Sequence, residues 1–322
     1  MLSAYSLLAD SNPIKLAGFA QGTTYHITYY DSLNRNFKKE IDSLLLDFDL
    51  SVSTYNSKSL ITKFNASNRG CIMDKYFKAC VIKAFEIWKL TDGAFDPTVY
   101  PLVNAWGFGP EKKSKLDSNQ ISQILKYVGL DKIIIKGDSL IKKDSRVGLD
   151  FNAFAQGYSV DVVSEYLFKK GIQHSLVEIG GEVFARNYKL NGQKWTVGIE
   201  MPYENKDSIN PLKAIASLSN LALSTSGNYR RFYYSNGVKY VHHIDPKSGY
   251  PTTNNLLSVS VFAENCITTD ASATGLLVLG LEKSIEYLNQ HPNINAYLIY
   301  INKNGALEVY KTDGLSQIIS EL

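Results

Sequence analysis

Strand-like and helix-like patterns interleave irregularly along this chain of 322 residues, and their order restricts the fold more than any other feature. A doubly wound parallel sheet requires strands and helices to alternate in strict succession. Here the strand patterns outnumber the helical ones, and several of them follow one another directly. We therefore predict an α+β fold: one domain over residues 1–322, built on a mixed-sheet scaffold with a partly separate helical lobe over about 51–143.

Hydrophobic spacing predicts the individual elements. Phe37, Ile41 and Phe48 recur at helical spacing, which predicts a helix over residues 34–49, and alternation over residues 22–30 predicts a strand. The same reasoning predicts helices at 76–90, 118–127, 157–170 and 270–279, and strands at 132–136, 146–151, 175–185, 195–200, 214–224, 256–263, 296–301 and 307–310.

Composition restricts the class of partner and the chemistry of the cysteines. The net charge is +3 without a long run of Lys and Arg, so we expect no nucleic-acid partner. No apolar stretch reaches the ~20 residues of a membrane-spanning helix. Cys71, Cys80 and Cys266 lack the spacing of zinc ligands. Cys71 and Cys80 can form a disulfide, but Cys80 lies in an amphipathic helical pattern, which favours a buried free thiol.

The segment 240–251 places two histidines and a carboxylate on a rigid turn. Its sequence is Tyr-Val-His-His-Ile-Asp-Pro-Lys-Ser-Gly-Tyr-Pro. Pro246, Gly249 and Pro251 restrict the backbone, so the turn can hold side chains fixed in a cleft. A turn of this kind also occurs by chance in proteins where it has no catalytic role.

A second segment, 269–275, carries a carboxylate and a hydroxyl on one helix face. Asp270 and Thr274 are four residues apart, which places both side chains on the same side of a helix. They can ligate a metal ion, although an Asp at the start of a helix is more often a cap. Together with the histidine pair, the segment indicates an enzyme that acts on a phosphorylated ligand.

Residues 93–109 combine chain breakers with large apolar side chains. A long regular element is excluded there by Pro97, Pro101, Gly107 and Gly109. The segment forms either the wall of a pocket or a loop that covers the core; its large side chains include Phe95, Trp106 and Phe108.

Seven motifs, in this order, resemble those of the ApbE family, the FAD:protein FMN transferases, over nearly the whole chain. The histidine turn and the Trp-Gly-Phe-Gly loop are moderately specific alone, and the seven together are highly specific. The motifs lie at 53–55 with Ser59 and Asn65; 93–97, 101–104 and 106–109; 149–153 with Gly157, Tyr158 and Asp161; 179–182; 226–229; 242–251; and 270–271 with Ala273 and Thr274.

The resemblance implies an activity. Family members split FAD and attach its FMN half, through a phosphoester, to a Thr or Ser hydroxyl of a target flavoprotein, releasing AMP. This phosphoryl transfer requires neutralisation of the pyrophosphate charge, alignment of the hydroxyl and removal of its proton. A hard divalent cation such as Mg²⁺ supplies the first requirement through oxygen ligands.

The resemblance also implies roles for particular residues. Asp270 and Thr274 would bind Mg²⁺ through side-chain oxygens, and Ala153, otherwise only a packing residue, would add its backbone carbonyl. His242 would act as the base or orienter for the acceptor hydroxyl. We prefer it to His243 because it keeps the family spacing to Asp245 and because neighbours in an extended chain point to opposite faces. The implied FAD contacts are Gln21, Tyr55, Ala94, Phe95, Asp96, Asp150, Gln156 and Ile244.

Three positions depart from the family pattern. Gln156 stands where many members have a lysine, which weakens direct neutralisation of the phosphates. His243 occupies a position that is usually aliphatic, and Ser248 replaces the usual threonine.

Two other functions remain open: an Mg²⁺-dependent FAD pyrophosphatase, which would use water as the acceptor, and a flavin-binding protein without turnover.

The expected partners follow from the same resemblance. They are FAD and a flavoprotein subunit with an Asp-Gly-x-Ser/Thr-Gly-Ala-Ser/Thr motif. In this chain, Asp313-Gly314 is followed by Leu315-Ser316-Gln317, which lacks the glycine and the second hydroxyl of that motif, so we expect no self-flavinylation. Family members are typically exported lipoproteins, so we expect the bacterial periplasm, with attachment to the inner membrane through an N-terminal lipid anchor that this sequence does not show.

Overall fold

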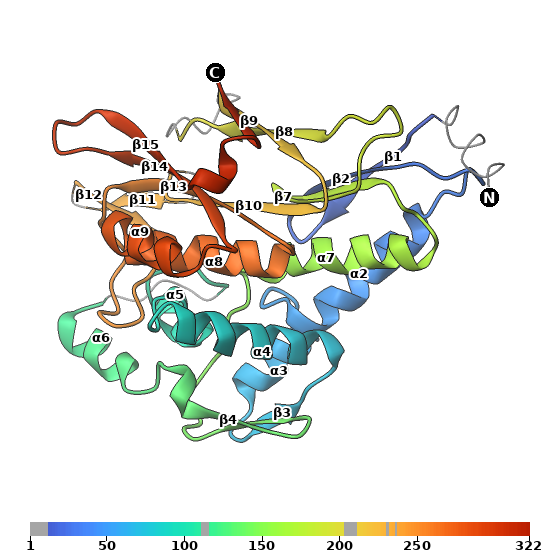
Figure 1. The fold of residues 1–322 in the computed structure, drawn as a ribbon. Helices are drawn as coiled ribbons and strands as arrows, with labels where there is room; N and C mark the ends of the chain where they lie inside the picture. The colour runs from blue at the N-terminus through green and yellow to red at the C-terminus, as the bar shows by residue number, and fades with distance from the viewer. Residues whose placement is uncertain (1–11, 111–115, 203–210, 230–231, 236) are drawn as a thin grey trace.

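The structure is a computed structural model that describes residues 12–110, 116–202, 211–229, 232–235 and 237–322. An eight-stranded sheet forms its centre, and helices pack against one face while a small sheet covers the other (Figure 1). A second group of helices, with a small sheet at its far end, lies beyond the first helical layer (Figure 1). Helices and antiparallel strands thus occupy separate layers, which confirms the predicted α+β class.

The central sheet is antiparallel at each pairing between its described strands. Strands β10 and β13 lie well inside it, where β10 pairs with β7 on one side and β13 on the other. The end of β10 lies against the helical layer, where the Ser226 hydroxyl is 3.2 Å from the Thr274 hydroxyl. In sheet order the strands are β1 (Ile14–Ala20), β2 (Thr23–Tyr29), β6 (Ser175–Ile179), β7 (Glu182–Arg186), β10 (Leu221–Gly227), β13 (Leu256–Ala263), β14 (Asn295–Ile301) and β15 (Leu307–Lys311).

Apolar side chains cover both faces of this sheet. On one face, β13 and β14 pack against α8 and α9 through a cluster that includes Val259 and Leu276. On the other, Trp195 and Phe262 belong to a cluster beneath the small sheet. The elements concerned are α7 (Ala155–Lys169), α8 (Cys266–Leu279) and α9 (Leu281–Gln290), and, in the small sheet, β16 (Ile319–Glu321), β9 (Leu212–Leu218) and β8 (Trp195–Glu200), which η3 (Asp313–Leu315) precedes.

Helices α7 and α8 cross closely and cap one another. Asp161 of α7 accepts hydrogen bonds from the backbone N–H groups of Cys266 (2.7 Å) and Ile267 (2.8 Å), in the first turn of α8. Asp270 of α8 accepts one from the N–H of Gly157 (2.9 Å), in the first turn of α7. Each carboxylate satisfies backbone donors that have no partner within their own helix and lies at the positive end of the other helix.

The segment predicted as a helical lobe, 51–143, contains helices and a three-stranded sheet. Its core is shared with the start of α7. Phe77 packs on Phe151 with ring centroids 5.2 Å apart, and Phe95 packs on Phe154 at 5.3 Å. The elements are α3 (Leu60–Ala66), α4 (Lys75–Leu90), η1 (Pro97–Val99), α5 (Tyr100–Ala105), α6 (Ser118–Leu125) and η2 (Leu130–Lys132), with the sheet β3 (Gly70–Ile72), β5 (Ser139–Lys142) and β4 (Ile133–Lys136).

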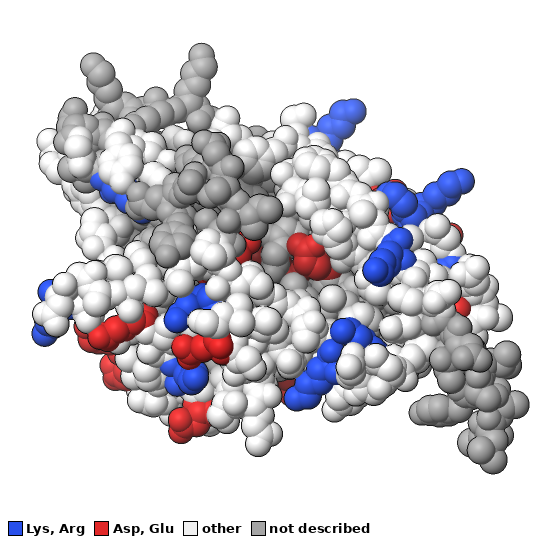
Figure 2. Space-filling view, turned by 90° about the horizontal axis from the view of Figure 1, so that it is seen from above, with Lys and Arg blue, Asp and Glu red and all other residues white. Residues whose placement is uncertain are grey.

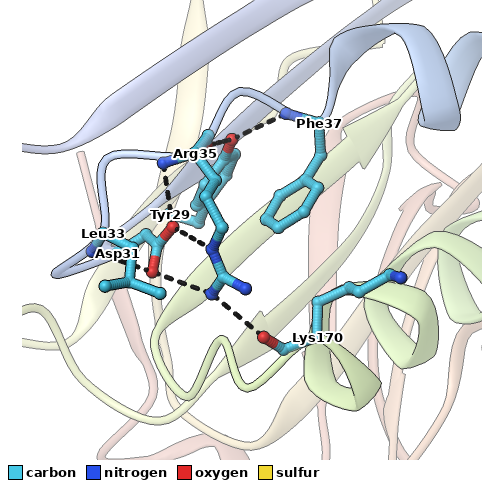
Figure 3. A network of polar contacts seen from close by, with 6 residues as sticks. All are labelled: Tyr29, Asp31, Leu33, Arg35, Phe37 and Lys170. Carbon is cyan, nitrogen blue, oxygen red and sulfur yellow. Dashed lines mark hydrogen bonds and ion pairs between the residues drawn. The ribbon is translucent and has the colours of Figure 1, made fainter.

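A polar network fixes helix α2 (Lys38–Val52) to the end of α7 (Figure 3). Asp31 accepts from the Arg35 Nε (2.8 Å) and Nη2 (2.9 Å), and the same Nη2 donates to the carbonyl of Lys170 (3.0 Å). The Arg35 guanidinium holds the pKa of Asp31 below its usual range. The network fixes where α2 begins, and α2 ends beside the candidate site.

The structure corrects several element boundaries. The predicted strand at 146–151 is wrong: the Leu149 N–H donates to the Asn65 side chain (2.7 Å) and the Asp150 N–H to the Pro97 carbonyl (2.8 Å), so no neighbouring strand pairs there. The predictions at 175–185 and 214–224 are each two strands, since the chain turns at Gly180 (φ 62°) and at Asn220 (φ 49°). Strand β1 was not predicted.

The structure also shows the state of the cysteines and the character of the described helices. Cys71, Cys80 and Cys266 are free thiols, and Cys80 is buried, as its helical pattern predicted. Among the helices that the structure describes, none combines the length and the apolar composition needed to cross a bilayer.

Surface charge is mixed on the face shown in Figure 2. Lys and Arg side chains are interspersed with Asp and Glu over the described part of that face. Some of the chain's surface charges form ion pairs: Glu321 lies 3.0 Å from the Lys311 Nζ and 3.8 Å from the Lys213 Nζ. Exposed pairs of this kind contribute little to stability.

We predict that Gly157→Ala destabilises the protein. Alanine normally stabilises a helix by roughly 1 kcal/mol relative to glycine. Here a Cβ would lie 2.5 Å from the Cys266 carbonyl oxygen and 2.7 Å from the Asp270 Cβ, so the two helices must separate. We expect a net loss of about 1–3 kcal/mol in the free energy of unfolding, measured by urea denaturation. Lys169→Ala, at an exposed position of α7, is the control. An unchanged or higher stability of Gly157→Ala would contradict the tight crossing.

Candidate functional site

A cavity of about 370 Å³ opens where six chain segments meet. Its walls come from the segment 94–108, residues 150–156 at the start of α7, the turn between β6 and β7, the end of β10, the turn at 242–246 and one face of α8. The predicted site residues that line it are Ala94, Phe95, Asp96, Asp150, Ala153, Gln156, His242, Ile244, Asp270 and Thr274. The tertiary fold therefore brings together residues from motifs that lie far apart in the sequence.

The two remaining predicted residues, Gln21 and Tyr55, line a second cavity of about 570 Å³. Asn152 and Gln156 line both cavities, so the two spaces adjoin at these side chains. Tyr55 is 58% exposed and therefore does not fill the core. A ligand with two separate ring systems can occupy both cavities at once.

Three predicted metal ligands present oxygen atoms to the first cavity. The Thr274 hydroxyl lies 3.2 Å from the Ala153 carbonyl oxygen and 3.2 Å from the Ser226 hydroxyl. Asp270 lies one turn before Thr274 on the same face of α8. Asp270 is not a cap of its own helix, because α8 begins at Cys266 and its cap is Asn265. A set of hydroxyl, carbonyl and carboxylate oxygens suits a hard divalent cation.

Burial controls the ionisation of Asp270. Loss of solvent raises its pKa to about 7, the Gly157 N–H opposes that shift, and the charge of Asp161 raises the pKa further. The pKa of Asp161 is itself raised to about 6 by burial. A cation beside Asp270 would reverse this preference and favour the carboxylate form.

His242 and His243 both line the first cavity, which corrects the prediction that their rings point to opposite faces. Strand β12 ends at Val241 and the chain bends at His242, so the alternation of an extended strand does not apply. The ring centroids are 3.8 Å apart, and the ring planes are inclined by 47°. The preference for His242 therefore depends on its spacing to Asp245 alone.

An aromatic stack holds the loop at 94–108 against the hairpin of β11 (Phe232–Ser235) and β12 (Val238–Val241). Trp106 stacks on Tyr240 with centroids 5.4 Å apart, and Tyr240 stacks on Tyr233 at 5.3 Å. The Trp106 Nε1 donates to the carbonyl of Gly249 in the histidine turn (2.8 Å). Both interpretations of this segment hold in part: Phe95 and Phe108 line the cavity, and the Phe95 ring, 2% exposed, also packs on Phe154 in the core.

Asp96 and Asp150 bind the backbone around them. The Asp96 carboxylate accepts from the Thr98 N–H (2.8 Å) and hydroxyl (2.6 Å) and from the Leu130 N–H (3.1 Å). Burial nevertheless raises the pKa of Asp96 to about 6. The Asp150 carboxylate accepts from the Asn152 N–H (2.8 Å). A ligand donor at Asp96 would have to compete with these contacts, so Asp96 shapes the cavity wall.

The Gln156 side chain contacts the turn between β6 and β7. Its Nε2 donates to the Ile179 carbonyl (3.0 Å). A Cβ on Gly180 would lie 1.5 Å from that Nε2, and Gly180 also has a φ of 62°. The positive φ favours glycine at this position, whereas the Gln156 amide, at the end of a flexible side chain, can move aside.

The comparisons with known proteins agree with these motifs. The model of the ApbE family matches residues 21–298. The chain belongs to the ApbE family. An FAD:protein FMN transferase from Haemophilus influenzae is 34% identical over 318 residues, which cover 94% of this chain and 91% of that protein.

Solved ApbE structures share the fold. The flavin transferase ApbE from Vibrio cholerae has a TM-score of 0.85 at 32% identity, covering 96% of this chain and 99% of that one. The apo form of the Pseudomonas stutzeri flavinyl transferase ApbE has a TM-score of 0.84 at 32% identity, covering 96% and 97%.

Sequence reasoning missed several residues at the site. Ser226 and Asp161 lie in motifs that carried the ApbE resemblance, yet no role was assigned to either. Ser226 places its hydroxyl beside Thr274, and Asp161 caps the helix that carries Asp270. Asp49, on the wall of the second cavity, gave no sequence signal, because an acidic residue on a helix surface is common.

We predict that stability without metal falls as the pH rises from about 4 to about 7. The folded-state pKa values of Asp270 (about 7) and Asp161 (about 6) lie above the ~3.9 of an unperturbed Asp, so the native state binds more protons than the unfolded state in this range. Asp270→Asn keeps an acceptor for the Gly157 N–H and should flatten the dependence. Urea midpoints at several pH values, measured with a chelator, test this. Parallel curves for the two proteins would contradict the assigned burial of the Asp270 charge.

Proposed function

We propose that this chain is an FAD:protein FMN transferase. The observation that carries the proposal is that His242, Asp270, Thr274 and Ala153 line one cavity in a member of the ApbE family. The relatives at 32–34% identity over most of the chain bear this name. The second cavity, which adjoins the first, gives the elongated FAD molecule a place for its second ring system.

The reaction transfers one phosphoryl group. The oxygen of an acceptor Thr or Ser hydroxyl bonds to the phosphorus of the FMN half. The bond from that phosphorus to the bridging oxygen breaks, and AMP leaves with this oxygen. We propose that His242 accepts the hydroxyl proton or orients the hydroxyl, because it lines the cavity and keeps the family spacing to Asp245.

We propose Mg²⁺ as the metal and Asp270, Thr274 and Ala153 as its protein ligands. In the part of the chain that the structure describes, no group of three or more His, Cys, Asp and Glu side chains is placed to hold a metal. One carboxylate with a hydroxyl and a carbonyl fits Mg²⁺, which keeps waters and substrate phosphates as its other ligands. When bound, the ion would neutralise charge on the pyrophosphate. Gln156 adds no charge, so we expect a strong dependence on the divalent ion.

The acceptor and the location are also proposals. By family resemblance, the acceptor is a flavoprotein subunit with an Asp-Gly-x-Ser/Thr-Gly-Ala-Ser/Thr motif, and the chain works in the bacterial periplasm at the inner membrane. FAD pyrophosphatase activity is the second candidate, since the same cavity can admit water as acceptor. The mass of an acceptor incubated with FAD separates the functions: a gain of FMN indicates transfer, and free FMN with an unchanged acceptor indicates hydrolysis.

We predict that His242→Ala reduces the rate of FMN transfer by ~10²–10⁴-fold while FAD still binds. His243→Ala should reduce the rate much less, because only His242 keeps the family spacing to Asp245. Transfer rates come from mass spectrometry of the acceptor, and FAD binding from flavin fluorescence. Equal losses in the two variants would contradict the preference for His242, and a larger loss in His243→Ala would assign the role to His243.

We predict that Asp270→Ala abolishes Mg²⁺-dependent transfer without unfolding the protein. The substitution removes the only carboxylate of the proposed ligand set and leaves α8 with its Asn265 cap. Transfer is measured over a range of Mg²⁺ concentrations, and circular dichroism checks the fold. Near-normal transfer at low Mg²⁺ would show that Asp270 is not a ligand.

A further inference from the structure

The second cavity contains a carboxylate at an unfavourable position. Asp49 lies in the last turn of α2, which carries no basic residue there. A negative charge at the C-terminal end of a helix is repelled by the helix dipole. Among the residues that the structure describes, none forms an ion pair with Asp49. Burial raises the pKa of its carboxyl to about 6, and the Gln21 side chain has a smaller, opposite effect. A charge kept in such surroundings is typical of a functional position.

A hydrogen-bond donor lies in the same cavity. The Gln21 Nε2 is fully buried, and a hydrogen bond from the Gln21 side chain lowers the pKa of Asp49. The Gln21 Oε1 accepts a hydrogen bond from the Ser159 hydroxyl of α7 (3.1 Å), which holds the side chain in place. A fixed amide donor and a carboxylate acceptor therefore line the same cavity.

The cavity also offers an aromatic surface. Tyr55 is 58% exposed and lines the same space as Gln21 and Asp49. Phe48 and Val52, one turn apart on α2, supply apolar lining. An exposed aromatic ring, a buried donor and a carboxylate acceptor together suit a flat heteroaromatic ring. Such a ring would stack on Tyr55 and form hydrogen bonds with the other two groups along one edge.

We propose that Asp49 is a specificity-determining residue that accepts a hydrogen bond from an N–H on the edge of a heteroaromatic ring, while Gln21 donates to the neighbouring acceptor on that ring. The inference rests on the proposed use of FAD. Both rings of FAD have this chemistry: adenine carries an amino group beside a ring nitrogen, and isoalloxazine carries an N3–H between two carbonyl oxygens.

Removal of one ring donor at a time tests the proposal. The ligands are FAD, its purine counterpart, which lacks the adenine amino group, and its N3-methyl counterpart, which lacks the flavin N–H. Affinities for wild type and Asp49→Asn are measured by flavin fluorescence with Mg²⁺ and no acceptor. Asp47→Asn, on an exposed position two residues away in the same helix, is the matched control.

We expect Asp49→Asn to bind FAD about tenfold to a hundredfold more weakly, the range for a hydrogen bond to a charged group. Wild type should discriminate against one of the two analogues, and Asp49→Asn should lose that discrimination. The analogue affected identifies the ring in the second cavity. Thermal stability of Asp49→Asn should stay equal or rise, since the substitution removes a charge from the negative end of α2.

Three results would overturn the inference. They are unchanged FAD affinity in Asp49→Asn, an equal loss for all three ligands, and a similar loss in Asp47→Asn. Failure of the proposed function looks different: wild type would bind FAD with the expected discrimination yet transfer no FMN to an acceptor. Wild type that does not bind FAD would overturn both.

Discussion

The reciprocal capping of α7 and α8 is the interaction on which the site depends. Asp161 accepts from the first turn of α8, and Asp270 accepts from the first turn of α7. Gly157 permits the close approach, because any side chain there would meet the backbone of the other helix. The crossing fixes the start of α7, and with it the Ala153 carbonyl, against the Thr274 hydroxyl. A small shift of either helix would separate the oxygens that we propose to bind the metal.

The opposite wall of the cavity is built differently. Aromatic stacking and one buried hydrogen bond from Trp106 join the loop, the hairpin and the histidine turn. Stacked rings restrict these segments, which are distant in the sequence. The side that we propose to hold the metal is therefore built from helices, whereas the histidines lie on a turn that aromatic stacking and the Trp106 hydrogen bond hold in place.

Several carboxylates at the site destabilise the folded protein. Burial raises the pKa values of Asp270, Asp161 and Asp49, so each of these charges is less stable in the folded chain than in water. For Asp161, the two N–H donors of α8 offset part of this cost. For Asp270 and Asp49, we propose that a bound ligand supplies the missing compensation, an ion at the first and a ring N–H at the second.

The sequence by itself determined the class of fold, the long elements and the composition of the site. The helix predicted at 76–90 is α4 (Lys75–Leu90), and the strand at 256–263 is β13, because amphipathic spacing over many residues reports directly on burial. The motifs named most of the cavity lining. Residue types and spacing predicted the chemical groups of the site: a carboxylate and a hydroxyl on one helix face, and histidines on a rigid turn.

The tertiary structure decided the rest. A strand exists only where a partner accepts its hydrogen bonds, so the residues at 146–151, which bind Asn65 and Pro97, form none. The orientation of His243 depends on a bend that its own sequence does not specify. The second cavity, with Asp49 beside Gln21, arises because α2 packs next to the β1–β2 turn. Local patterns record what each segment buries, whereas a site depends on contacts between segments that are distant in the chain, and only packing fixes those.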